Sequence, residues 1–211
     1  MIEQAKGQAR APALLIACGA LAREIVEVIR VNGFEGLTVT CLPAQLHNRP
    51  ERIPEAVRAK IRAAREAYSR IYVLYGDCGS GGLLDKVLEE EGVERIDGPH
   101  CYAFYSGVER FLVQADAEPA VFYLTDYLAR HFDRLIVEGL GLDRHPELRD
   151  DYFGNYKKLV YLAQGDEPEL LAKAEAAAKR LGLAFEQRRT GMGELGDFIA
   201  RAAAGETPWP S

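Results

Sequence analysis

The residues best suited to chemistry in this chain are its cysteines, and all of them fall in the first half. Each stands at or near the end of an apolar run typical of a β-strand: Cys18 in "ACGA", Cys41 in "TCLP", Cys78 in "GDCGSGG" and Cys101 in "PHCY". Two histidines, His47 and His100, also follow strand-like runs. Because ligands bind outside the carboxyl ends of parallel strands, we expect these thiols and imidazoles at one sheet edge.

Thiolates and imidazoles are preferred ligands of zinc and iron–sulfur clusters, and three protein ligands leave one coordination position open. We expect Cys18, Cys78 and Cys101 to hold such a metal. Each stands beside a glycine or at a helix start, where amides and the helix dipole stabilise a thiolate. His100 or His47 would supply a fourth ligand or orient one of the others. The alternative is that the cysteines only fill space, as we expect for Cys41.

The turn "YGDCGSGG" around Cys78 has three interpretations. Gly76, Gly79 and Ser80 would contact an anion if the turn cradles a phosphate, although it lacks the lysine and the spacing of the known nucleotide-binding loops. Asp77, beside the thiol, would take a proton or orient an imidazole. The plainer alternative is that the glycines bend the chain while Asp77 or Ser80 caps the following helix.

The loop "LHNRPERIP" supplies two further candidates. Arg49 would hold a substrate carboxylate through two parallel hydrogen bonds, and His47 would face the same substrate. The alternative is a stiff connector held by its prolines. The catalytic candidates are therefore Asp77, His47 and Arg49.

The second half of the chain is rich in aromatic residues. "FYLTDYLARHFDRL" carries Tyr123, Asp126, Tyr127, Arg130 and His131 at helical spacing, which favours a packed face in the core or in a homo-oligomer. Residues 143–145, in "LDRHP", would cover the site as a lid or cap a helix. The sequence has no Gly-x-Ser-x-Gly elbow, His-Glu-x-x-His helix or kinase signature, which disfavours the hydrolases and kinases built on them.

These residues must be positioned by alternating strands and helices. Strands are predicted at 13–18, 37–42, 70–75, 93–97, 157–163 and 183–188, and helices at 20–33, 55–68, 167–182 and 194–203 among others. The alternation predicts a single α/β domain with a doubly wound, mostly parallel sheet of about six strands and helices on both faces. Residues 102–156 would form a helical cap, and residues 204–211 a frayed tail.

The composition is that of an ordinary globular protein. The chain has 211 residues and a net charge of −6, and its basic residues are not clustered, which disfavours nucleic acids and anionic membranes as partners. Its longest apolar run is too short to span a bilayer, and its first residues lack the apolar stretch of a signal peptide. We therefore expect a cytoplasmic protein whose cysteines are thiols or ligands, not disulfides.

Six stretches together resemble the bacterial and archaeal family catalogued as domain of unknown function 1638, over about residues 13–203. They are "IACGALAREI", "LHNRPE", "VLYGDCGSGGLLDKVL", "GPHCY", "FYLTDYLARHFD" and "YFGNYKKLVYLAQ". The genes of this family often neighbour components of corrinoid-dependent methyl transfer. The resemblance thus implies a role in one-carbon metabolism, with a corrinoid or methyltransferase protein as a partner.

Three functions follow as hypotheses. The first is a metal-dependent transferase or redox accessory that uses zinc or an iron–sulfur cluster on a small-molecule substrate, since a zinc-bound thiol has a lowered pKa yet stays nucleophilic. The second is a module without chemistry that docks a partner or dimerises through its aromatic helices. The third is a metal-free thiol or anion-site enzyme centred on Cys78.

Overall fold

The computed structural model describes residues 13–206, in which strands and helices alternate almost throughout. The tail expected to fray at 204–211 begins within this range, where the last helix ends at Ala204. Residues 207–211, like residues 1–12, lie outside the described residues.

The first sheet has four parallel strands in the order β2-β1-β3-β4. Its central strand is β1 (Ala13–Cys18), flanked by β2 (Leu37–Leu42) and β3 (Arg70–Leu74), with a short edge strand β4 (Glu94–Arg95). Every residue of β1 is buried, as expected for a strand covered on both faces. The register pairs Ala17 with both Cys41 and Leu74, so the carboxyl ends of the three long strands lie side by side.

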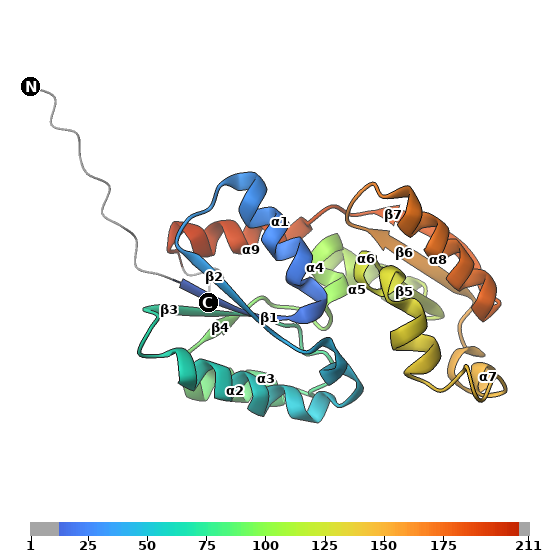
Figure 1. The fold of residues 1–211 in the computed structure, drawn as a ribbon, viewed down its shortest axis with the longest axis horizontal. Helices are drawn as coiled ribbons and strands as arrows, with labels where there is room; N and C mark the ends of the chain where they lie inside the picture. The colour runs from blue at the N-terminus through green and yellow to red at the C-terminus, as the bar shows by residue number, and fades with distance from the viewer. Residues whose placement is uncertain (1–12, 207–211) are drawn as a thin grey trace, which may run out of the picture.

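Helices cover both faces of this sheet (Figure 1). α1 (Ala22–Asn32) and α9 (Gly193–Ala204) lie on one face, and α2 (Ile53–Ala64) and α3 (Leu83–Glu91) lie on the other. Three 3-10 turns, η1 (Gly19–Leu21), η2 (Ala44–Asn48) and η3 (Pro50–Arg52), follow the carboxyl ends of β1 and β2.

The second sheet has three parallel strands in the order β5-β6-β7. They are β5 (Val121–Thr125), β6 (Lys158–Ala163) and β7 (Ala184–Arg189). One face packs in a core with α6 (Asp126–Arg130), the π-helix η4 (Asp133–Glu138), α7 (Leu148–Phe153) and α8 (Pro168–Leu181). The other face meets α4 (Cys101–Ser106) and α5 (Val108–Ala117) through ring contacts of Tyr102, Phe111 and Tyr123.

The two sheets therefore organise two lobes, which Figure 1 shows side by side with α4 and α5 between them. The first lobe comprises residues 13–117 and α9, because Leu195, Phe198 and Ile199 return to the first core. The second lobe comprises residues 121–189 and has a core of its own. Burial of apolar surface drives the formation of each core separately.

The predicted α/β class with parallel strands is confirmed, but the strands divide between two sheets instead of forming one. The additional strand is β5, in a stretch where aromatic spacing favoured a helix. Val121 and Tyr123 face α4 and α5, whereas Phe122 and Leu124 face the second core, so apolar neighbours on both sides select the extended conformation. No helix within residues 13–206 has the length and apolarity to cross a bilayer.

Candidate functional site

A cavity of about 170 Å³ lies between the lobes, outside the carboxyl ends of β1, β2 and β5. The first lobe contributes η1, η2 and the start of α4, and the second contributes the end of β5, α6 and η4. Most of the wall is apolar, with a few polar groups among it. The lining side chains that matter most below are Ala20, Ala44, His47, Cys101, Tyr102, Phe122, Thr125 and Tyr127.

Cys18 and His47 meet at the first-lobe side of this cavity. Cys18 is 2 % exposed, and its Sγ lies 3.8 Å from Nδ1 of His47 and accepts a hydrogen bond from the Ala20 amide at 3.4 Å. His47 Nδ1 lies 3.1 Å from the carbonyl oxygen of Ala44, which can only accept, so this nitrogen carries the proton. His47 therefore keeps Nε2 unprotonated, and burial lowers the pKa of its imidazole, which favours the neutral ring.

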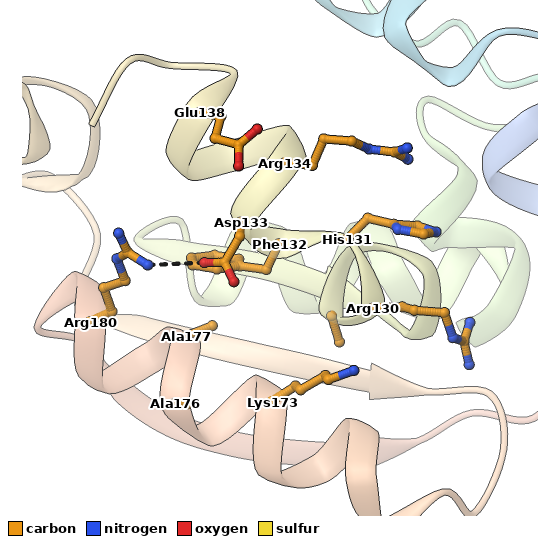
Figure 2. A pocket seen from close by; sticks show the side chains of 11 residues that line it. Arg130, His131, Phe132, Asp133, Arg134, Glu138, Lys173, Ala176, Ala177 and Arg180 are labelled. Atoms are coloured by element: carbon orange, nitrogen blue, oxygen red, sulfur yellow. Dashed lines mark hydrogen bonds and ion pairs between the residues drawn. The ribbon is translucent and has the colours of Figure 1, made fainter. Parts of the chain in front are cut away.

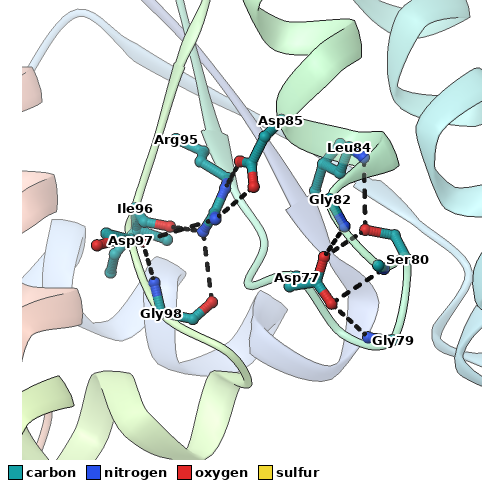
Figure 3. Close-up of polar contacts among 11 residues, drawn as sticks. Asp77, Gly79, Ser80, Gly82, Leu84, Asp85, Arg95, Ile96, Asp97 and Gly98 are labelled. Atoms are coloured by element: carbon teal, nitrogen blue, oxygen red, sulfur yellow. Dashed lines mark hydrogen bonds and ion pairs between the residues drawn. The ribbon is translucent and has the colours of Figure 1, made fainter.

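The glycine turn after β3 is folded around its own aspartate (Figure 3). The Asp77 carboxylate accepts hydrogen bonds from the amides of Gly82 at 2.8 Å and of Gly79 and Gly81 at 3.2 Å, and from the Ser80 hydroxyl at 2.8 Å. Partial burial acts to raise the pKa of Asp77, but these hydrogen bonds outweigh it and lower the pKa. Asp77 thus occupies the amides that a phosphate would need.

The same turn is tied to the segment before α4. The amides of Asp77 and Cys78 donate to the carbonyl oxygens of Gly98 and Pro99 at 3.0 and 2.9 Å. A Cβ on Gly76 would lie 2.9 Å from the Gly98 oxygen, so only glycine permits this close approach. Cys78 has a φ of 50°, which is unusual for a residue with a side chain and is found mainly at functional sites and tight turns. These contacts bring Cys78 close to Cys101.

The three cysteines predicted to act together end β1, follow β3 and begin α4, and burial governs the pKa of each thiol. Burial raises the pKa of Cys18 to about 12 and of Cys78 to about 11, and it raises the pKa of Cys101 well above its usual value. Electrostatic repulsion from Cys78 and Cys18 raises the pKa of Cys101 further. At neutral pH all three are protonated.

The thiols do not form a ready-made metal site. Within residues 13–206, no group of three or more His, Cys, Asp and Glu side chains has an arrangement that would hold a metal ion. The donor types suit zinc or iron, but the side chains would have to rotate to share one ion.

The other predicted site residues lie apart from the cavity wall. His100 is exposed before α4, with its ring 6.1 Å from that of Tyr102, and Arg49 is exposed between η2 and η3. Cys41 packs against the first core from β2. Gly79 is exposed, whereas Gly76 and Ser80 are buried in the turn. Asp143, Arg144 and His145 are exposed and do not line the cavity.

Two buried polar atoms in the same region lack a hydrogen bond of good geometry, and the sequence did not point to either. They are the hydroxyl of Tyr75, which follows β3, and Oε2 of Glu24 in the first turn of α1. Burial raises the pKa of Tyr75, and repulsion from Cys18 and a hydrogen bond to it raise this pKa further, so the hydroxyl lies against that thiol. Buried polar groups without partners are costly and are therefore rare away from functional sites.

The second-lobe residues of the cavity were also missed, because their position depends on β5. Thr125 ends β5 and caps α6 by accepting a hydrogen bond from the Leu128 amide at 3.4 Å. Tyr127 follows within α6, and its ring lies 4.7 Å from that of His131. The sequence would have pointed to these residues only if a strand ending at Thr125 had been predicted, because that strand defines the carboxyl edge of the second sheet.

Comparison with known proteins bears on the same residues. The sequence profile of a family described as "Protein of unknown function (DUF1638)" matches residues 41–199, which is most of the chain. The chain belongs to this DUF1638 family. The match includes Cys78, Cys101 and His47 and leaves Cys18 outside it. Neither the search of curated proteins nor the search of solved structures found a match.

Proposed function

We propose that this DUF1638 protein binds a small organic molecule in the cavity between its lobes, where His47 and the Cys101 thiol contact that molecule. The observation that supports the proposal is the meeting of His47 and Cys101 in one wall of a cavity at the carboxyl edge. Ligand sites of α/β proteins lie in this place, and they combine an apolar wall with a few convergent polar groups.

The size of the cavity limits the ligand. At about 170 Å³ it is close to an engineered cavity of ~150 Å³ that takes up benzene. A single ring or a short branched chain fits this volume, whereas a dinucleotide or a corrinoid macrocycle does not. A corrinoid, if it takes part, would stay on its own protein.

The polar groups of the wall have distinct roles. His47, neutral and protonated at Nδ1, offers Nε2 as an acceptor for a hydroxyl or amide proton of the ligand. Thr125 and Tyr127 offer hydroxyl groups from the second lobe. The thiols stay protonated until a positive charge approaches, because burial raises their pKa values. A metal-free attack by Cys78 at neutral pH is therefore disfavoured.

A cavity-filling variant tests this proposal. Single-ring and short-chain fragments should bind the wild-type protein in ligand-observed NMR, and Ala20→Leu should abolish the binding because Ala20 lines the cavity. The matched control is Ala63→Leu, an exposed site on α2. Fragments that bind both variants equally, or that do not bind the wild type, would contradict the proposal.

A second candidate function is uptake of a soft metal ion, zinc or iron, by Cys18, Cys78 and Cys101. The presence of three thiols at one edge favours it, because a metal cation displaces the thiol protons and its positive charge offsets the repulsion between the thiolates that form. The Tyr75 hydroxyl, which lies against the Cys18 thiol, would donate a hydrogen bond to that sulfur once it is metal-bound. The side chains must first rotate toward one another.

Metal titration under anaerobic conditions separates the two candidates. Reduced wild-type protein should take up zinc or ferrous iron in a stoichiometric ratio, Cys78→Ser should lose this uptake, and Cys41→Ser should keep it. Uptake that is unchanged in Cys78→Ser would exclude the metal role while leaving the cavity proposal intact. Methyl transfer and a corrinoid or methyltransferase partner stay predictions that rest on the family resemblance.

A further inference from the structure

The second lobe has another cavity, of about 500 Å³, between the α6–η4 stretch and α8. It lies on the side of α6 that carries Arg130 and His131, whereas Tyr127 and Leu128 line the cavity between the lobes. Four cationic side chains line the second cavity, against two carboxylates, in a chain whose net charge is −6. The cations are Arg130, Arg134, Lys173 and Arg180. The wall of this cavity therefore carries more cationic than anionic side chains, although the chain as a whole is acidic.

Three of these four cations have carboxylate partners, and one of them, Lys173, pairs with Glu169 outside the cavity at 2.7 Å. Asp133 pairs with Arg180 at 2.9 Å inside the cavity. Glu167, which does not line it, lies 3.1 Å from Arg130 and also 3.0 Å from Arg23, so one carboxylate faces two guanidinium groups. Arg134 forms no ion pair with a carboxylate among residues 13–206, and its side chain hydrogen-bonds that of Tyr127. An anion in the cavity would compensate the charge of Arg134.

The neighbouring cations change the pKa of His131. Burial lowers the pKa of its imidazole, and Arg134, Arg130 and Lys173 lower it further. Figure 2 shows the side chains of Arg130, His131 and Arg134 extending from the α6–η4 stretch to the same side.

The backbone of this stretch is also unusual. η4 (Asp133–Glu138) has π-helical hydrogen bonding, which is rare and is found mainly at functional sites. The π-helix follows α6 after a short break, and Asp133 and Arg134 both lie in it. An irregular backbone that presents an uncompensated arginine is a second sign of a ligand.

We propose that the cavity between α6–η4 and α8 is an anion site for the phosphate or diphosphate group of a small molecule. Guanidinium groups match the geometry of phosphate oxygens and bind them through paired hydrogen bonds. Arg134 would provide the main contact, with Lys173 and Arg130 as supporting charges. This site is independent of the function proposed for the cavity between the lobes.

Calorimetry with inorganic phosphate and with pyrophosphate, at low ionic strength, tests the site on the full chain. Pyrophosphate should bind more tightly than phosphate, and added salt should weaken both. Arg134→Gln should weaken pyrophosphate binding by about tenfold or more, the loss expected for one charge-assisted hydrogen bond. Arg30→Gln, on the exposed face of α1, is the matched control and should change binding by less than about twofold.

NMR titration of His131 provides an independent readout. Saturating pyrophosphate should raise the pKa of its imidazole, because a bound anion offsets the neighbouring cations. No binding by the wild type, equal weakening by Arg134→Gln and Arg30→Gln, or an unchanged His131 titration would each overturn the proposal.

Discussion

The carboxyl edges of the two sheets contrast sharply in how their polar groups are satisfied. At the second edge, Asp126 is buried and accepts hydrogen bonds from the Tyr161 hydroxyl at 2.7 Å and from the amides of Gln164 and Gly165 at 3.2 and 3.1 Å. The Gln164 side-chain oxygen in turn accepts a hydrogen bond from the Asp126 amide at 2.8 Å. At the first edge, the Cys18 thiol has only weak contacts, with His47 Nδ1, the Ala20 amide and the Tyr75 hydroxyl, and none of them is a hydrogen bond of good length and geometry.

The difference suggests separate roles for the two edges: the hydrogen bonds at the second edge stabilise the fold, and the polar groups at the first are free to contact a ligand. A saturated network such as that of Asp126 holds β5 and β6 together and leaves no group free for a ligand. Unsatisfied groups beside a cavity reduce stability, and their persistence is best explained by a ligand that satisfies them. The first edge is therefore where we propose that a ligand is recognised by polar groups, and the second edge contributes a wall to the same cavity.

Removing the saturated network should have the largest effect on stability. Asp126→Ala leaves the buried Gln164 amide, the buried Tyr161 hydroxyl and the Gly165 amide without their partner, which should lower the free energy of unfolding by about 3 kcal/mol. Chemical denaturation measures the change. Asp166→Ala, which removes an exposed ion pair with Arg189, is the control and should cost less than about 1 kcal/mol. Equal losses would mean that the two edges do not differ in this way.

A methyl group added at each edge should have unequal effects. Gly76→Ala would press a Cβ against the Gly98 carbonyl at 2.9 Å, and we expect a loss of about 2 kcal/mol together with a displaced Cys78. Gly165→Ala at the second edge would meet Asp126 at an ordinary 3.6 Å and should be close to neutral. Thermal denaturation of the two variants makes the comparison, and a neutral Gly76→Ala would contradict the close approach.

The buried thiols should make the protein less stable in alkali. Because burial raises the pKa of Cys18 from 9.0 to about 12, its contribution to stability is fully present below pH 9 and is lost as the pH rises toward 12. At pH 10 the loss from this thiol should be about 1 kcal/mol. The free energy of unfolding of Cys18→Ala should therefore fall less steeply between pH 8 and pH 10 than that of the wild type. Parallel profiles would show that Cys18 titrates normally in the folded protein.

The sequence could predict the first edge because its signals are local. Cys18 ends an apolar strand, and Cys78 and Cys101 stand in glycine- or proline-containing turns, so the rule for parallel sheets places them together. The role of Asp77 was less predictable, since the same letters suit an aspartate that caps its own turn and a turn that binds phosphate. The structure distinguishes the two possibilities, because the amides of the turn donate their hydrogen bonds to the Asp77 carboxylate.

The cavity itself could not be predicted, because it depends on contacts between distant segments. His47 and Cys101 meet Thr125 and Tyr127 only because β5 begins a second sheet beside α4. The stretch "VFYLT" has aromatic residues that suit a strand as well as a helix, and tertiary packing decided between them. The buried Oε2 of Glu24, which has no hydrogen-bond partner, likewise has no signal in an amphipathic helix pattern.

The most direct test of the central claim is chemical-shift mapping of isotopically labelled protein with a single-ring fragment that binds. The account predicts that the largest shifts fall on His47, Cys101, Thr125 and Tyr127, from both lobes, and that they disappear in Ala20→Leu. Shifts confined to one lobe, or to the cationic cavity beside α8, would contradict it.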